Sequence, residues 1–204
     1  MEFLVVVTII GVLIAVVAIV IKPQDLFSKN KDFQRTTDMQ IINSAIDILK
    51  QEEPTIYMGD AKKIYLSLPD ANSNCSLWLS KLPPLPLGYQ YVCSANPKNM
   101  DGTGWIPIDF TKTNMLKMTE LPVNPINSPP YYDAYAVDEN KYNLATFLES
   151  DANKKIDSTA GKDAGISWNN FEAGTNLKLI PPAVEEGMRK DKNLVAYWPF
   201  DEGV

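Results

Sequence analysis

The sequence contains no histidine among its 204 residues. Histidine is the commonest general base in enzymes and the commonest protein ligand of transition metals, so its absence removes the simplest route to either kind of site. The chain also lacks a nucleophile elbow, a phosphate-binding loop and the ligand spacing of a zinc site. We therefore expect no enzyme activity, no catalytic residue, no cofactor and no resident metal.

Positive charge is also scarce. Nineteen Lys and Arg residues stand against 25 Asp and Glu residues, for a net charge of −6. No basic stripe interleaved with aromatic residues occurs, so we do not expect nucleic acid as a partner. No Lys or Arg precedes Lys22. By the positive-inside rule, the part of the chain after residue 22 would stay in the cytoplasm unless a basic leader preceded Met1.

Cysteine occurs only at Cys75 and Cys93. A disulfide between them would close a loop whose constraint is worth about 3 kcal/mol. Such a bond would place the domain in an oxidising compartment, as expected for an exported protein. Two buried free thiols are the alternative.

A long apolar run fills the start of the chain, from Phe3 to Ile21, and only Thr8 and Gly11 interrupt it. As a helix it would be roughly 28 Å long, close to the ~30 Å hydrocarbon core of a bilayer. The run is longer than a signal-peptide core, and no small-x-small cleavage site follows it. We expect a single-pass membrane helix, for which a simple anchor is the alternative role.

The residues from Glu2 to Ala15 read EFLVVVTIIGVLIA. They resemble the N-terminal, methylation-type segment of type IV pilins and of type II secretion pseudopilins. The shared pattern is a glutamate, an aliphatic run with Ile-Ile-Gly, and a proline, here Pro23, before an amphipathic continuation. The resemblance implies that Glu2 meets the N-terminal amine of a neighbouring subunit during assembly.

Two features depart from that family. Only Met1 precedes Glu2, so we expect the start of the chain to lie upstream or to have been trimmed; Pro23 also lies about a turn later than usual. Gly11 and Pro23 bracket a segment weakened by low helix propensity and a missing N–H donor. We predict a continuous or gently kinked helix in the lone subunit, which melts locally between these two residues in a filament.

After residue 23 the apolar residues first recur on one side of a predicted helix and then alternate with polar residues, as in strands. An amphipathic helix is predicted over 25–51, ending before Pro54. Strands are predicted at 62–68, 89–93 and 105–110, with Pro107 confining the last to an edge or bulge, and a brief helix at 76–82. The runs 131–137 and 142–148 predict a hairpin joined by four residues, 138–141. A polar loop at 150–165 precedes a last apolar cluster, which we expect to pack on the head: Trp168, Phe171, Leu177, Leu179 and Ile180.

These patterns predict an α+β fold in which a long N-terminal membrane and stalk helix packs on a small antiparallel β-sheet head, as in pilins. We divide the chain into a transmembrane or filament-core helix (1–22), a stalk helix (23–53), a globular head (54–150) and a loop-rich extension (151–192). Residues 193–204 resemble the opening strand of a concanavalin-like or laminin G-like jelly roll. Either that domain is truncated, or the segment pairs with the head.

A calcium site is a further candidate. Asp138, Glu139, Asp151 and Asp157 could bind calcium from separate loops, as in the major pseudopilins, but Lys155 interrupts the only loop-like spacing. Solvated turn carboxylates are the favoured interpretation, so we assign no metal ligand.

The predicted function is that of a structural subunit of a type IV pilus-like extracellular filament, held in the membrane by its N-terminal helix before assembly. The expected partners are identical subunits, the membrane, a prepilin peptidase and the assembly machinery. Glu2, Gly11 and Pro23 are the assembly residues. The alternatives are a pseudopilin of type II secretion and a membrane-anchored surface protein that binds glycans.

Overall fold

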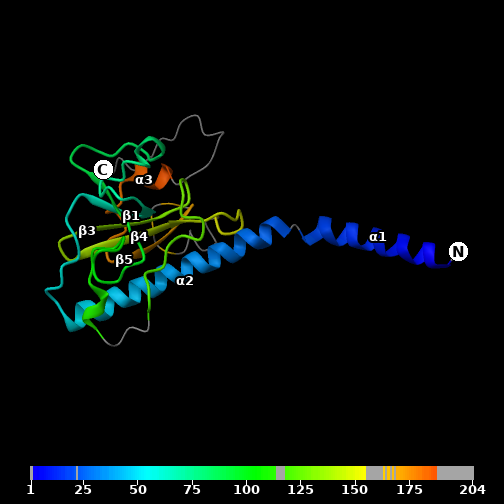
Figure 1. The fold of residues 1–204 in the computed structure, drawn as a ribbon, viewed down its shortest axis with the longest axis horizontal. Coiled ribbons are helices and arrows are strands. Elements are labelled where there is room, and N and C mark those ends of the chain that lie inside the picture. The colour runs from blue at the N-terminus through cyan, green and yellow to red at the C-terminus, as the bar shows by residue number, and fades with distance from the viewer. Residues whose placement is uncertain are drawn as a thin grey trace, which may run out of the picture.

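The computed structural model describes residues 2–21, 23–113, 118–154, 163, 165, 167 and 169–187. The helices are α1 (Glu2–Ile21), α2 (Pro23–Glu52) and α3 (Pro182–Gly187), and two 3₁₀ turns are η1 (Leu79–Lys81) and η2 (Phe110–Lys112). The strands are β1 (Lys63–Pro69), β2 (Gln90–Ser94), β3 (Asp133–Asp138), β4 (Lys141–Phe147) and β5 (Asn170–Gly174). Figure 1 shows α2 lying along the sheet while α1 extends away from it.

Helix α2 begins at Pro23, a position where the missing N–H costs nothing because the first turn of a helix has no partner for it. Asp25 in the first turn and Lys50 in the last turn complement the helix dipole. Asp25 also pairs with Lys29 at 2.8 Å, one turn along. The helix predicted over 25–51 is thereby confirmed.

The five strands form one sheet in the order β2-β1-β3-β4-β5. Strands β3, β4 and β5 run antiparallel to their neighbours, whereas β1 and β2 run parallel. The predicted hairpin is confirmed as β3–β4, but its turn is tighter than expected. Asp138 and Lys141 pair across the ladder, which leaves a two-residue turn with Glu139 at φ 54°.

The two faces of the sheet bury separate apolar clusters. One face packs against α2 through Met39, Ile42, Ile46 and Leu49, which meet Tyr135 and other residues of the sheet and the loop 105–110. The opposite face, with Ile64, Leu66 and Tyr91, is covered by Leu82, by Ile180 just before α3, and by Val184 within α3. The sheet is therefore the middle of three layers, and side chains alternate between the two clusters along each strand.

The expected fold class, a long N-terminal helix on a small antiparallel sheet as in pilins, is wrong. The sheet is mixed, because the chain between β1 and β2 crosses over rather than turning in a hairpin. The N-terminal helical region consists of two helices, α1 and α2, and only α2 packs on the sheet. Strand patterns in a sequence predict which residues are extended, but they do not fix strand direction.

Within the described ranges, no helix combines the length and the apolar character needed to cross a membrane.

Two local predictions also differ from the structure. Residues 105–110 were expected to form a strand, but residues 105–109 are irregular apart from one isolated bridge, Asp101–Asp109, and Phe110 begins the 3₁₀ turn η2. Trp105, Ile106 and Ile108 are nevertheless buried, so their apolar pattern reflects burial and not strand pairing. Strand β5 lies within residues 151–192, where we expected a loop-rich extension, and it adds an edge strand to the sheet beside β4.

Part of the expected last apolar cluster is present on the sheet. Phe171 belongs to the cluster under α2, and Ile180 to the cluster on the opposite face. Trp168 and residues 193–204, including the segment similar to a jelly-roll strand, lie outside the described residues.

Candidate functional site

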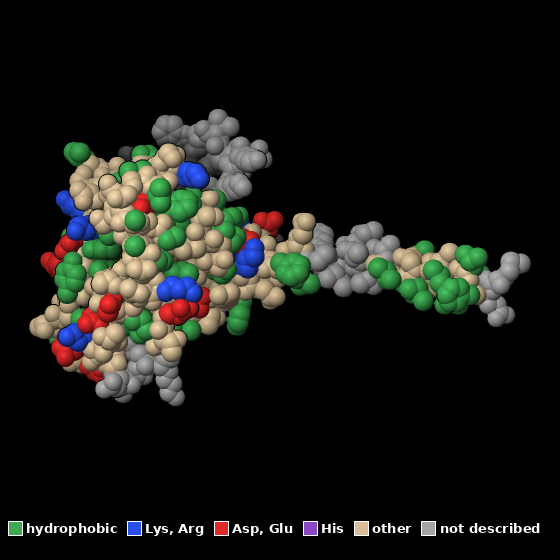
Figure 2. Space-filling view, in the orientation of Figure 1, with side chains coloured by type: hydrophobic (Ala, Val, Ile, Leu, Met, Phe, Trp, Pro, Cys, Tyr) green, Lys and Arg blue, Asp and Glu red, His purple; other side chains and the backbone are tan. Residues whose placement is uncertain are grey.

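Helix α1 exposes an apolar surface that the rest of the molecule does not cover. Every described side chain from Phe3 to Ile14 is exposed, including Phe3 at 82% and Leu4 at 71%. Thr8, the polar interruption, donates its hydroxyl hydrogen to the carbonyl of Val5 at 2.8 Å, so this donor is satisfied within the helix and needs no hydrogen bond from another molecule. Figure 2 shows hydrophobic side chains along this projecting helix, whereas charged side chains are spread over the head. An apolar patch of this extent is typical of an interaction site.

The outer side of α2 extends this apolar character. Leu26, Phe33 and Ile41 are exposed by 48%, 74% and 45%. At 3.6 residues per turn they share the side of the helix opposite Ile42 and Ile46, which are buried against the sheet. Helix α2 therefore exposes three large apolar side chains on a side that its own head does not cover.

The three predicted assembly residues all lie on this helical arm. Glu2 is the first residue of α1, and Pro23 is the first residue of α2. A Cβ added to Gly11 would meet no atom within 4 Å, so nothing inside the chain requires glycine there. The residue between α1 and α2, Lys22, lies outside the described residues, and the predicted local melting in a filament stays a prediction.

A buried ionic network fixes α2 to the head. Asp32 and Arg35, one turn apart on α2, are 0% and 1% exposed. Arg35 Nη1 donates to Asp32 Oδ1 at 3.1 Å, while its Nη2 donates to Asn124 Oδ1 at 3.2 Å and also pairs with Glu149. The guanidinium also lies 5.6 Å from the centre of the Tyr131 ring. These contacts tie the helix to the segment after β4.

Asp32 completes this connection through the backbone. Its Oδ1 accepts the N–H of Glu149 at 2.7 Å, and its Oδ2 accepts the N–H of Ser150 at 2.9 Å and the amide of Asn153 at 3.1 Å. A buried carboxylate that accepts backbone N–H groups and pairs with a guanidinium is fully satisfied. The amphipathic pattern over 25–51 predicts the helix but not this network, because its partners outside α2 are more than 80 residues away in the chain.

Asp133, at the start of β3, extends the same network. It is 2% exposed, and its Oδ1 accepts from Thr146 Oγ1 at 2.6 Å and from Asn124 Nδ2 at 3.1 Å. Burial raises the pKa of Asp133 to about 6, although these hydrogen bonds and the charge of Arg35 lower it. The desolvation cost of the ionised form outweighs the contacts that favour it.

This pKa predicts a pH-dependent stability. A carboxyl that titrates near pH 6 when folded and near 3.8 when unfolded stabilises the fold below pH 4 and loses that contribution as the pH rises through 6. The variant Asp133→Asn keeps an acceptor for Thr146 and cannot ionise. Between pH 4 and pH 7, its free energy of unfolding should therefore rise relative to the wild type by about 2–3 kcal/mol. Urea unfolding at several pH values measures this difference, and a constant difference would contradict the assignment.

Cys75 and Cys93 form a disulfide with an S–S distance of 2.10 Å. Cys93 lies in β2, and its backbone N–H donates to the carbonyl of Ser73 at 3.0 Å. Asp70 holds the same loop by accepting the N–H groups of Asn72 and Leu77, each at 2.8 Å. The bond therefore fastens the loop 70–79 to the exposed edge of the sheet.

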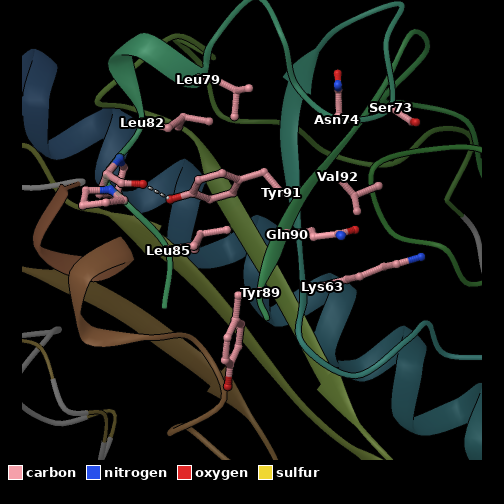
Figure 3. A pocket seen from close by; sticks show the side chains of 12 residues that line it. Lys63, Ser73, Asn74, Leu79, Leu82, Leu85, Tyr89, Gln90, Tyr91 and Val92 are labelled. Carbon is pink, nitrogen blue, oxygen red and sulfur yellow. Dashed lines mark hydrogen bonds between the residues drawn. The ribbon is translucent and has the colours of Figure 1, made fainter. Parts of the chain in front are cut away.

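A groove of about 720 Å³ runs along that edge. Figure 3 shows Leu79, Leu82 and Leu85 on one side of Tyr91, with Val92, Gln90 and Lys63 on the other. Tyr91 donates its hydroxyl hydrogen to the carbonyl of Pro83 at 2.9 Å and so fixes the proline-rich segment 83–86 against β2. This groove could not be predicted from the sequence, because the fold brings Lys63 of β1 together with the loop 73–85 and with residues 89–92.

The calcium candidates are not brought together. Asp138 and Glu139 lie at the β3–β4 turn, Asp151 follows β4 in the chain, and Asp157 lies outside the described residues. Among the residues whose placement is described, no group of three or more acidic or cysteine side chains could hold a metal ion.

No family model, no curated protein and no solved structure matches this chain.

Proposed function

We propose that this protein is a structural subunit of a type IV pilus-like filament, which assembles through α1. The observation that carries the proposal is the exposed apolar surface from Phe3 to Ile14. Burying such side chains stabilises an assembly by roughly 25 cal/mol per Å² of apolar surface removed from water. Identical subunits carry the same helix, so the apolar surface of α1 in one subunit can pack against the same surface of a neighbouring subunit.

The outer side of α2 supports an assembly of whole subunits rather than a simple anchor. An anchor needs apolar residues only in the part that contacts lipid. Here Leu26, Phe33 and Ile41 continue the apolar surface onto the helix that carries the head. The buried contacts of Arg35 and Asp32 hold that helix at a fixed position on the sheet, so that stacked helices would also set the spacing of the heads.

In this proposal the run from Phe3 to Ile21 holds the subunit in the membrane before assembly, and a prepilin peptidase processes the N-terminus. A pseudopilin would use the same surfaces in a shorter assembly, and only the length and location of the assembled product separate the two. The carboxylate of Glu2 would meet the N-terminal amine of a neighbour where water is excluded. Such a pair acts mainly to fix the register of neighbouring subunits, because desolvation offsets much of its attraction.

The variant Glu2→Leu tests this proposal. It makes α1 more apolar, so membrane retention and head folding should be unchanged, whereas the yield of sheared extracellular filament should fall at least tenfold. Wild type and variant would be expressed with a basic leader in a host that has pilus assembly machinery. Comparing the membrane-bound and sheared fractions measures the effect.

The matched control is Glu52→Leu. Glu52 is exposed at the far end of α2, so the same chemical change there should leave filament yield unaltered. Equal filament yield from Glu2→Leu and wild type would reject the pilus-like role, and equal loss in both variants would show that the effect is not specific to Glu2.

A further inference from the structure

The loop that the disulfide fastens to β2 carries the sequence pattern of an acceptor for an N-linked glycan. Residues 74–76 read Asn-Cys-Ser, which fits the pattern Asn-X-Ser/Thr with X other than proline. This acceptor triplet is the only one in the sequence. Three residues can match such a pattern by chance, so the exposure and the bonding of the loop decide whether the triplet can serve.

The folded loop has room for a sugar on Asn74. The side chains of Asn74 and Ser76 are exposed, whereas Cys75 between them is 0% exposed. Figure 3 shows the Asn74 side chain pointing away from Val92. No hydrogen bond among the described residues occupies its carboxamide. A bulky group on this nitrogen would therefore lie in solvent and displace no hydrogen bond of the described fold.

The neighbouring asparagine has the opposite arrangement. Asn72 Nδ2 donates to Ser76 Oγ at 2.9 Å, so this amide is engaged inside the loop. The Ser76 hydroxyl accepts there and keeps its own hydrogen as a donor. A transferase recognises the hydroxyl two residues after the asparagine. Asn74 meets this requirement, whereas Asn72 has Asn74 at that position and does not.

The disulfide supports export of this loop. Cys75 and Cys93 are joined, and disulfides persist in oxidising compartments such as the cell surface. N-glycans are attached to exported chains, on which they form bulky, solubilising groups at the surface. The loop therefore combines the sequence pattern, the exposure and the redox setting that the modification requires.

We propose that Asn74 carries an N-linked oligosaccharide, which is added before Cys75 pairs with Cys93. In the transfer, Asn74 Nδ2 forms a bond to the anomeric carbon of an oligosaccharide held on a lipid phosphate. The bond from that carbon to the carrier phosphate breaks, the phosphate leaves with the electron pair, and Nδ2 releases one proton. The proposal needs export of the head but not its assembly into a filament.

The order of the two events follows from the geometry of the closed loop. The Cys75 N–H donates to the carbonyl of Asn72 at 3.1 Å, and Cys75 has φ 57°, so the backbone turns sharply inside the acceptor triplet. A transferase needs the asparagine and the hydroxyl together on a stretch of accessible backbone. The bonded turn does not offer such a stretch, so closure of the disulfide ends the period in which Asn74 accepts a sugar.

Mass spectrometry of the protein, isolated from the surface of the cells that make it, tests the modification. After reduction, trypsin releases the peptide 64–81, which holds both Asn72 and Asn74. Electron-transfer dissociation then locates an added mass on one residue or the other. We expect an oligosaccharide on Asn74, and an unmodified peptide or a sugar on another of its residues would overturn the proposal.

Four variants made in the same cells test whether the acceptor triplet directs the transfer. Asn74→Gln and Ser76→Ala should each lower the glycosylated fraction by about tenfold or more, whereas Ser76→Thr keeps the hydroxyl and should retain the sugar. Asn72→Gln is the matched control, because it makes the same change two residues earlier and leaves the acceptor triplet intact. An equal loss in Asn72→Gln would overturn the assignment, because the loop as a whole and not the triplet would then govern the transfer.

The double variant Cys75→Ser, Cys93→Ser tests the order of events. Serine is allowed at the middle position, so the variant keeps an acceptor triplet in a loop that cannot close. Its glycosylated fraction should be at least as large as that of the wild type, and a smaller fraction would show that the closed loop is the form that is modified. Glu2→Leu should leave the mass on Asn74 unchanged, so a failure of the filament role and a failure of this proposal give different results.

Discussion

Replacing Arg35 with methionine should lower the free energy of unfolding by about 3–5 kcal/mol. Methionine keeps much of the apolar stem of Arg35 but leaves the buried carboxylate of Asp32 and the nearly buried carboxylate of Glu149 without their shared cation. A buried charge that loses its partner keeps its full desolvation cost. Urea unfolding at pH 7, monitored by circular dichroism, measures the loss.

The control is Lys98→Met, which removes a cation from the solvent-exposed surface instead of from the buried interior. Lys98 pairs with Glu120 at 2.8 Å, but both side chains are more than half exposed. Water screens such a pair, so its loss should change stability by less than about 1 kcal/mol. If Arg35→Met were as mild as Lys98→Met, the network would not be the connection between α2 and the head.

Removing the disulfide should cost about 3 kcal/mol. The bond joins residues 18 apart, and a closed loop of that size restricts the unfolded chain by roughly this amount. The double variant Cys75→Ser, Cys93→Ser should therefore unfold at a lower urea concentration than the oxidised wild type. The reduced wild type should unfold close to the double variant.

A local effect should accompany this loss. The disulfide fastens the loop 70–79 to β2, so amide exchange at Cys93 or its serine replacement should accelerate, while the β3–β4 hairpin keeps its protection until global unfolding. An unchanged urea midpoint in the double variant would show that the hydrogen bonds of Asp70 hold this loop by themselves.

The sequence predicted the elements whose signals are local. The amphipathic spacing of Met39, Ile42 and Ile46 located α2, and alternating residues on either side of Asp138 located the hairpin. Strand β5 was missed because its sequence, NFEAG, has one large apolar residue and no alternation. Its place at the sheet edge depends on pairing with β4, about 30 residues earlier, which no short pattern records.

The sites differ in the same way: a site with a local or unique sequence signal could be predicted, whereas a site built from residues far apart in the chain could not. Cys75 and Cys93 could be paired from the sequence because no other cysteine exists, although free thiols remained an alternative. The network of Asp32, Arg35 and Glu149 could not be predicted, because each side chain taken alone resembles a solvated charge on a helix or a loop. Only the crossing of α2 over the segment after β4 removes these groups from water.

The position of this network along α2 decides how the molecule responds to mechanical load. A pull on α1 enters the head through the first turns of α2, and Lys31, Asp32 and Arg35 are the first described residues there whose side chains are bonded to the segment after β4. The load therefore reaches short, directional polar contacts before it reaches the apolar packing from Met39 to Leu49. Polar contacts of this kind give way over a small extension, whereas apolar packing yields gradually as surface is exposed. The subunit should thus resist small forces as a stiff body and lose that stiffness abruptly once the contacts of Asp32 break.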